Sequence, residues 1–305
     1  MSLALLVAPS LAVAAAAKNI VFIAGRPSHG PGQHEHHAGS LLLQKCLAGF
    51  PGVTTQVFDN GWPSVMKDGK RTDDHSALEK ADAVVIYSDG GGGHPALQGD
   101  RLQVLERLTK KGVGLGLIHY AVEPTLANGQ KEFLDWVGGA FEINRSVNPH
   151  WFADFKSLPD HPVTRGVKLF ATTDEWYFNL RFRDGLRGVT SILAAIPPAS
   201  TMSRPDGPHE GNPNAREAVA KGTPQVVMWV SERADGGRGF GFTGGHFHLG
   251  WRNDDQRKLV LNAVLWIAKV DVPKDGVPSV LTDEDLQANL DPKPPRTPAP
   301  ATAKP

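Results

Sequence analysis

The chain has 305 residues, and its 32 basic and 32 acidic side chains give a formal net charge of zero. Neither charge forms a long run, which disfavours a nucleic-acid-binding surface. A hydrophobic content of 40% is typical of a globular protein with a core. The one cysteine, Cys46, excludes an intramolecular disulfide, and its apolar helical surroundings indicate a small buried residue.

The two ends of the chain differ in composition from the rest. Residues 1–17 form an apolar, alanine-rich run with Ala-x-Ala options, which predicts a signal peptide and hence an exported (periplasmic or secreted) protein. No basic residue precedes the run, so a leader on a cytoplasmic protein is the alternative. No segment predicts a membrane span. Residues 271–305 are rich in proline and predict a disordered tail, dispensable for folding beyond about residue 285, so the folded domain should span 18–270.

Strands and helices alternate in the first half of the domain. Short apolar runs predict strands, and spacings of three and four predict helices. The expected strands are 18–25, 53–60, 81–89, 113–120, 189–196, 225–232 and 237–245, and the expected helices are 34–48, 96–112, 132–141 and 254–270. This order predicts an α/β fold with an open, mostly parallel, doubly wound sheet and helices on both faces. The glycines of GVGLG (112–116) lie within a strand and so indicate close packing rather than a dinucleotide site.

Eight of the twelve histidines follow predicted strands. Four lie within residues 29–37, His94 follows the third strand, His119 ends the fourth, and His246 and His248 follow a late strand. Ligands of open parallel sheets bind beyond the carboxyl ends of the strands. The histidines are therefore predicted to line one pocket.

His119 follows a buried strand in GLIHY, where amidotransferase-type folds carry a nucleophilic cysteine. Histidine at this place can move protons or bind a metal, and no G-x-S-x-G nucleophile elbow occurs. Asp174 and Glu175 adjoin Trp176 and Tyr177, a combination of carboxylates and rings that suits sugar chemistry. A solvated turn between core aromatics is the alternative.

Histidine spacing also allows a metal site. In an extended segment the side chains of His246 and His248 lie on one face. With His34 and His119 they would form a plausible set of ligands for Zn²⁺ or a similar divalent ion. No tight H-x-x-x-H or C-x-x-C pattern supports this set, so a site without metal is the alternative.

Several segments together resemble the ThuA-like family, which is named for trehalose utilisation. The matching segments are IVFIAG with His34 after it, GVGLGLIH with His119, DHPVTRGV with His161, DEWYFN with Asp174, Glu175 and Trp176, and GGHFHLGW with His246. The resemblance covers about residues 19–269 and implies a flavodoxin-like fold related to class I glutamine amidotransferases, here without their cysteine. It also implies the use of disaccharides such as trehalose, a link to sugar oxidoreductases, and 3-keto-sugar intermediates.

We therefore expect an enzyme that acts on a disaccharide, glycoside or keto-sugar by acid/base chemistry. A carbohydrate-binding protein without turnover is the alternative, a metal-storage protein is a weaker one, and a homo-oligomer stays open. The expected catalytic residues are His119, Glu175 and Asp174. The expected substrate-binding residues are His34, Glu123, His161, Trp176, His246 and Trp251, where Glu123 replaces an aspartate that is commoner in the family.

Overall fold

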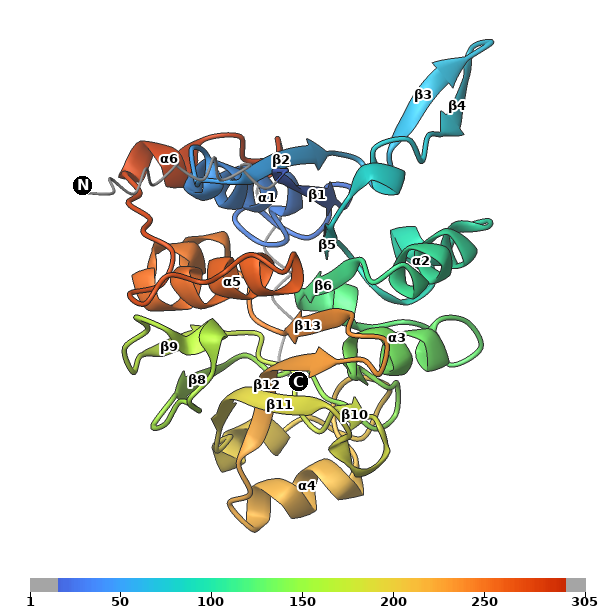
Figure 1. Ribbon diagram of the computed structural model, residues 1–305. Helices are drawn as coiled ribbons and strands as arrows, with labels where there is room; N and C mark the ends of the chain where they lie inside the picture. The colour runs from blue at the N-terminus through green and yellow to red at the C-terminus, as the bar shows by residue number, and fades with distance from the viewer. Residues whose placement is uncertain (1–15, 295–305) are drawn as a thin grey trace, which may run out of the picture.

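A seven-stranded sheet forms the centre of the computed structural model, which describes residues 16–294 (Figure 1). The strand order is β11-β12-β13-β6-β5-β1-β2. The five strands that pair in parallel are β1 (Lys18–Ala24), β2 (Val53–Phe58), β5 (Ala83–Tyr87), β6 (Gly114–Ile118) and β13 (Arg238–Phe242). Two antiparallel strands, β11 (Val189–Ala195) and β12 (Gln225–Glu232), complete one edge. The predicted mostly parallel α/β sheet is thus confirmed.

Helices cover both faces of the sheet (Figure 1). On one face, α1 (His36–Leu47) and α5 (Asp254–Ile267) share a core cluster with Ile20 and Phe22 of β1. On the other face, α2 (Arg101–Lys110) and α3 (Gln130–Val137) pack in the cluster that contains Val21 and Ile23. Successive residues of a strand point to opposite faces, so burial of both faces explains the continuous apolar runs.

Glycine in β6 allows close packing with its neighbours. A Cβ atom at Gly116 would lie 2.3 Å from the ring of Phe240, and one at Gly114 would lie 2.2 Å from the carbonyl oxygen of Ile267. Both positions leave room only for hydrogen, so the packing interpretation of GVGLG is confirmed.

The second half of the chain adds short elements around this sheet. The predicted helix over 132–141 ends at Val137, because Gly138 adopts φ 82° and stops it. A hairpin of β3 (Ser64–Lys67) and β4 (Lys70–Asp73) projects from the body (Figure 1). The remaining elements are β7 (Gly139–Ala140) with β10 (Arg181–Phe182), β8 (Trp151–Asp154) with β9 (Ala171–Asp174), α4 (Pro213–Ala220) and α6 (Asp283–Gln287).

The segment after α5 is folded as far as the structure describes it. Val277 and Leu286 are buried, and α6 begins with a capping box at Thr282. Further on, the backbone N–H of Asp291 donates to the carboxylate of Glu35. The predicted disordered tail is therefore wrong for 271–294, because its few apolar residues are placed where they reach the core. Residues 295–305 and residues 1–15 of the predicted signal peptide lie outside the described part.

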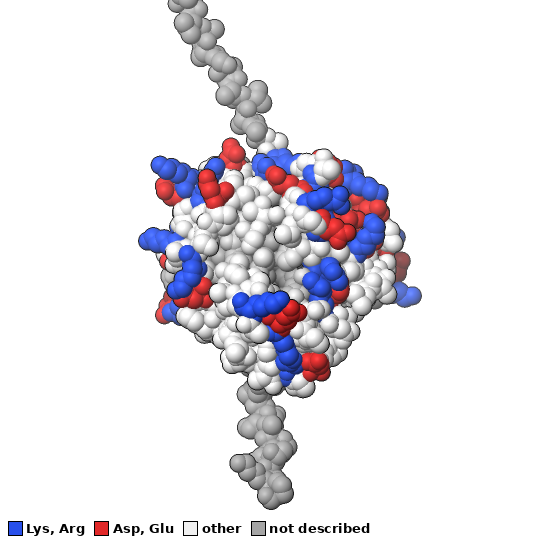
Figure 2. All heavy atoms as spheres, turned by 90° about the horizontal axis from the view of Figure 1, so that it is seen from below, with Lys and Arg blue, Asp and Glu red and all other residues white. Residues whose placement is uncertain are grey.

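Charge is mixed on the surface. On the face shown in Figure 2, basic and acidic side chains lie next to one another and neither sign forms a continuous patch. Over residues 16–294, every helix is too short or too polar to cross a membrane.

Candidate functional site

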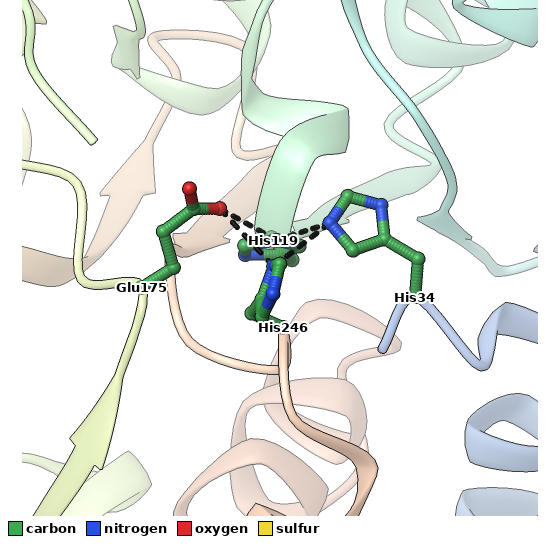
Figure 3. A group of neighbouring side chains, drawn as sticks. All are labelled: His34, His119, Glu175 and His246. Carbon is green, nitrogen blue, oxygen red and sulfur yellow. Dashed lines mark hydrogen bonds and ion pairs between the residues drawn. The ribbon is translucent and has the colours of Figure 1, made fainter. Parts of the chain in front are cut away.

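Three strand ends bring three histidines together at the carboxyl edge of the sheet. His34 lies in the loop between β1 and α1, His119 begins the 3-10 helix η4 (His119–Val122) after β6, and His246 follows β13. The Nε2 atom of His34 is 3.0 Å from Nε2 of His119 and 3.0 Å from Nδ1 of His246 (Figure 3). All three side chains are buried.

Glu175 joins the histidines from the segment after β9. Its Oε2 atom lies 3.2 Å from Nδ1 of His246 and 3.5 Å from Nε2 of His119 (Figure 3). The hydroxyl of Tyr177 donates to the same oxygen over 3.2 Å. Burial raises the pKa of Glu175, but its hydrogen bonds with His150 and His246 outweigh this, and the pKa lies well below its usual range. The carboxylate is therefore ionised at neutral pH.

Contacts behind the histidine rings fix their orientation. Nδ1 of His34 is 2.7 Å from the carboxylate of Asp89, which also accepts from the hydroxyl of Ser28. Nδ1 of His119 is 2.8 Å from the carbonyl oxygen of Thr243. Burial lowers the pKa of His34 to about 4 and that of His119 well below its usual value. Burial thus favours the neutral form of both rings, and the contacts at Nδ1 direct their Nε2 atoms into the cluster.

Backbone strain accompanies this arrangement. His34 and His119 have φ of 47° and 58°, in the left-handed region that few side chains adopt. Such conformations cluster at functional sites, where surrounding contacts over-determine them. The sharp change of direction after each strand turns both rings toward the cluster.

Asp174 supports the loop that carries His246. Its fully buried carboxylate accepts the backbone N–H groups of Gly245 and His246 over 2.8 and 3.0 Å, and that of Glu175 over 2.8 Å. Burial raises the pKa of Asp174 to about 6 despite these donors. The residue predicted as catalytic thus holds three backbone groups, next to the cluster.

A cavity of about 200 Å³ adjoins the cluster. On its wall, Nε2 of His209 lies 3.0 Å from both carboxylate oxygens of Glu123. Burial raises the pKa of Glu123, and the hydrogen bond with Glu123 raises the pKa of His209. The full lining is His29, His34, Tyr120, Asn148, Glu175, Tyr177, Arg204, His209 and Glu210.

Sequence reasoning missed His209 and Asp89. His209 lies in the irregular segment before α4, where no strand end marks it. Asp89 follows β5, at the edge where the histidines were noticed, and its position could have indicated it. A larger cavity of about 590 Å³ includes Asp89 in its lining but none of the histidines. The chemistry therefore favours the smaller cavity.

Four predicted site residues lie outside both the cluster and the adjoining cavity: Trp176, Trp251, His161 and His248. Trp176 and Trp251 are fully buried and pack near Phe242, so neither offers a ring face to a sugar, and their predicted role is wrong. His161 caps the 3-10 helix η5 (Pro162–Thr164) by accepting the N–H of Val163.

His248 is separated from His246 by a change of backbone direction. The chain enters the 3-10 helix η8 (His248–Arg252) instead of continuing extended. Among the described residues, the four-residue group that could hold a metal contains Glu175 and not His248. Of the four predicted ligands, His34, His119 and His246 therefore lie together, and Glu175 takes the place predicted for His248.

Comparison with known proteins agrees with this architecture. A crystal structure of a ThuA-like protein from Bacteroides uniformis has 14% sequence identity and a TM-score of 0.55, and the match covers 85% of this chain and 95% of that chain. At this identity the similarity concerns the fold alone. No curated protein matches the chain. The model of the ThuA family, described by trehalose utilisation, matches residues 33–267, which include all four residues of the cluster. The chain therefore belongs to the ThuA family, and so to the proteins of carbohydrate metabolism.

Proposed function

We propose that this protein is an enzyme that acts on a keto-sugar, in the form of a disaccharide or other glycoside, by proton transfer in the cavity beside the histidine cluster. One observation carries the proposal: His209, whose pKa is raised by its hydrogen bond with Glu123, and His29, whose pKa is lowered by burial, line the same cavity of about 200 Å³. Groups whose surroundings push their pKa values apart are typical of acid/base sites. Membership of a family described by trehalose utilisation supports a sugar as substrate.

The two histidines at the cavity's edge are assigned complementary roles. His209 is the acid, because its hydrogen bond with Glu123 favours the protonated ring. It gives its proton to the glycosidic oxygen as the bond between that oxygen and the keto-sugar carbon breaks, or to the carbonyl oxygen when the sugar only forms an enol. His29, half-exposed on the same cavity and stacked on His34 at 3.5 Å, is the base that takes the proton from the carbon next to the carbonyl group.

A keto group explains why proton transfer suffices. A C–H bond next to a carbonyl ionises far more readily than one in an unoxidised sugar, because the carbonyl oxygen takes up the negative charge. The enzyme would then need an oxidoreductase to supply its substrate, in agreement with the expected link to such enzymes. Polar side chains on the wall, such as Asn148 and Arg204, offer hydrogen bonds to hydroxyl groups.

The test compares keto-sugars with their parent sugars. The full chain is incubated in D₂O with trehalose and with 3-keto-trehalose, and NMR follows exchange at the carbon next to the carbonyl and release of glucose. We expect turnover of the keto form only, and a roughly 100- to 10,000-fold lower kcat for His209→Gln. His161→Gln, which lies outside the cavity, is the control and should keep full activity.

Binding without turnover would favour the alternative, a carbohydrate-binding protein. In that case wild-type protein binds the sugar by calorimetry, while the NMR spectra show neither exchange nor release. Equal kcat in the His209→Gln variant would remove His209 from the mechanism.

A further inference from the structure

We propose that His34, His119, His246 and Glu175 bind one divalent transition-metal ion. The proposal deepens the proposed function, since it names a cofactor for the same cavity, but its test does not require a sugar. It also separates the ligands from the proton-transferring residues, because neither His29 nor His209 belongs to the four.

The tautomers of two histidines carry the argument. Nδ1 of His119 faces the carbonyl oxygen of Thr243 at 2.8 Å, and a carbonyl can only accept, so the ring proton is on Nδ1. Nδ1 of His34 faces the carboxylate of Asp89 at 2.7 Å and carries its proton for the same reason. In the neutral rings, each Nε2 atom therefore carries a lone pair and no proton.

These two lone pairs point at each other. The Nε2 atoms of His34 and His119 are 3.0 Å apart, which is hydrogen-bond distance, yet neither neutral ring has a proton to place between them. Two lone pairs at this distance repel each other. A cation bound by both Nε2 atoms would be coordinated by the two lone pairs, and the repulsion between them would be removed.

The other two donor atoms complete a shell of suitable size. Nδ1 of His246 is 3.0 Å from Nε2 of His34, and Oε2 of Glu175 is 3.2 Å from Nδ1 of His246. All four donor atoms lie within 4.8 Å of one another. Metal–ligand bonds of about 2.0–2.2 Å in a tetrahedron place the donors roughly 3.3–3.6 Å apart. The observed spacings fit this arrangement.

The surroundings also fit a metal centre. Ligating histidines usually donate their other ring N–H to a carboxylate or a backbone carbonyl, as His34 and His119 do here. Within residues 16–294, Nε2 of His246 has no hydrogen-bonding partner, so the ring's polar contacts run through Nδ1 into the cluster. Three imidazoles and one carboxylate, without sulfur, suit Zn²⁺ or another late first-row ion.

The experiment measures metal directly on the full chain without a histidine tag. After chelation and dialysis, Co²⁺ is titrated by its visible absorption, and Zn²⁺ is counted by elemental analysis. We expect about one equivalent of metal and a higher Tm in its presence. His34→Gln and Glu175→Gln should abolish the Co²⁺ spectrum, and Asp89→Asn should weaken binding roughly 10- to 100-fold.

His248→Gln is the matched control, because it changes the other histidine of the same His-x-His pair. It should bind metal like the wild type. The proposal is overturned if the wild-type protein takes up less than about a tenth of an equivalent of metal. It is also overturned if His248→Gln loses as much metal binding as His34→Gln. Metal binding without turnover of any keto-sugar defeats only the proposed function. Turnover by wild-type protein that takes up no metal defeats only the metal proposal.

Discussion

At the residue scale, Glu123 and His209 form a pair whose ionisation can be measured by varying the pH. Glu123 is buried and His209 is partly exposed, so each changes the other's ionisation through two short contacts of 3.0 Å. The ion pair exists above the pKa of Glu123 and below that of His209. Both pKa values are raised, which moves this window upward in pH.

Turnover should therefore fall as pH rises through the pKa of His209, because the acid loses its proton. Glu123→Gln removes the carboxylate that raises this pKa, so the fall should move to lower pH. The raised pKa also means that His209 contributes stability below the unfolded value of about 6.5, which is lost as pH rises through the folded value. Measurement of kcat against pH, with NMR titration of the His209 ring, checks the prediction. An unchanged profile in Glu123→Gln would contradict it.

At the scale of elements, the clamp between β9 and the loop after β13 is the clearest case of one segment ordering another. Asp174 ends β9 and receives two backbone N–H groups from that loop. These hydrogen bonds join the two segments that place His246 and Glu175 in the cluster. The geometry of the clamp depends on a carboxylate with two accepting oxygens.

Asp174→Asn should weaken this clamp, because an amide NH₂ cannot accept and faces a backbone donor instead. We expect a loss of roughly 1–3 kcal/mol in the free energy of unfolding, measured by denaturant titration. Metal affinity should fall as well, since the loop carries His246. Asp160→Asn, an exposed change, is the control. An effect no larger than that of the control would show that Asp174 does not hold the loop.

The elements that sequence alone could predict are those with a strong periodic signal. β1, β5 and β6 have continuous apolar runs, and their ends placed His34 and His119 at one edge. Glu175 was predicted from its neighbours Asp174 and Trp176 and not from a period. His209 and the β3–β4 hairpin lie in short segments where neither period is visible. The predicted sugar-stacking role of Trp176 and Trp251 was wrong, because the sequence does not distinguish a ring that faces a ligand from one that faces the core.

At the scale of the whole molecule, the end of the described chain returns to the histidine loop. Nζ of Lys293 lies 3.1 Å from the carboxylate of Glu35, and it donates to the carbonyl oxygens of Gln33 and His34. The side chains of Lys293 and Glu35 are 5% and 1% exposed, so this is a buried ion pair. It lies directly behind the first ligand of the proposed metal site.

Lys293→Met should lower the free energy of unfolding by about 3–5 kcal/mol, because Glu35 would remain as a buried charge without its cation. The same reason reverses the expectation that residues beyond about 285 are dispensable. Denaturant titration measures the loss. The double variant Glu35→Gln with Lys293→Met removes both charges and should recover much of the stability. A single variant as stable as the wild type would show that the contact is unimportant.

The contact between Lys293 and His34 has a consequence for synthesis of the chain. It joins positions 259 residues apart, so His34 leaves the ribosome long before Lys293 is synthesised. Contacts of such separation form slowly, because the entropic cost of closing a long loop opposes them. The histidine loop therefore lacks this support until Lys293 has been synthesised. The proposed metal site gains this support only after the strands that precede its ligands have been synthesised.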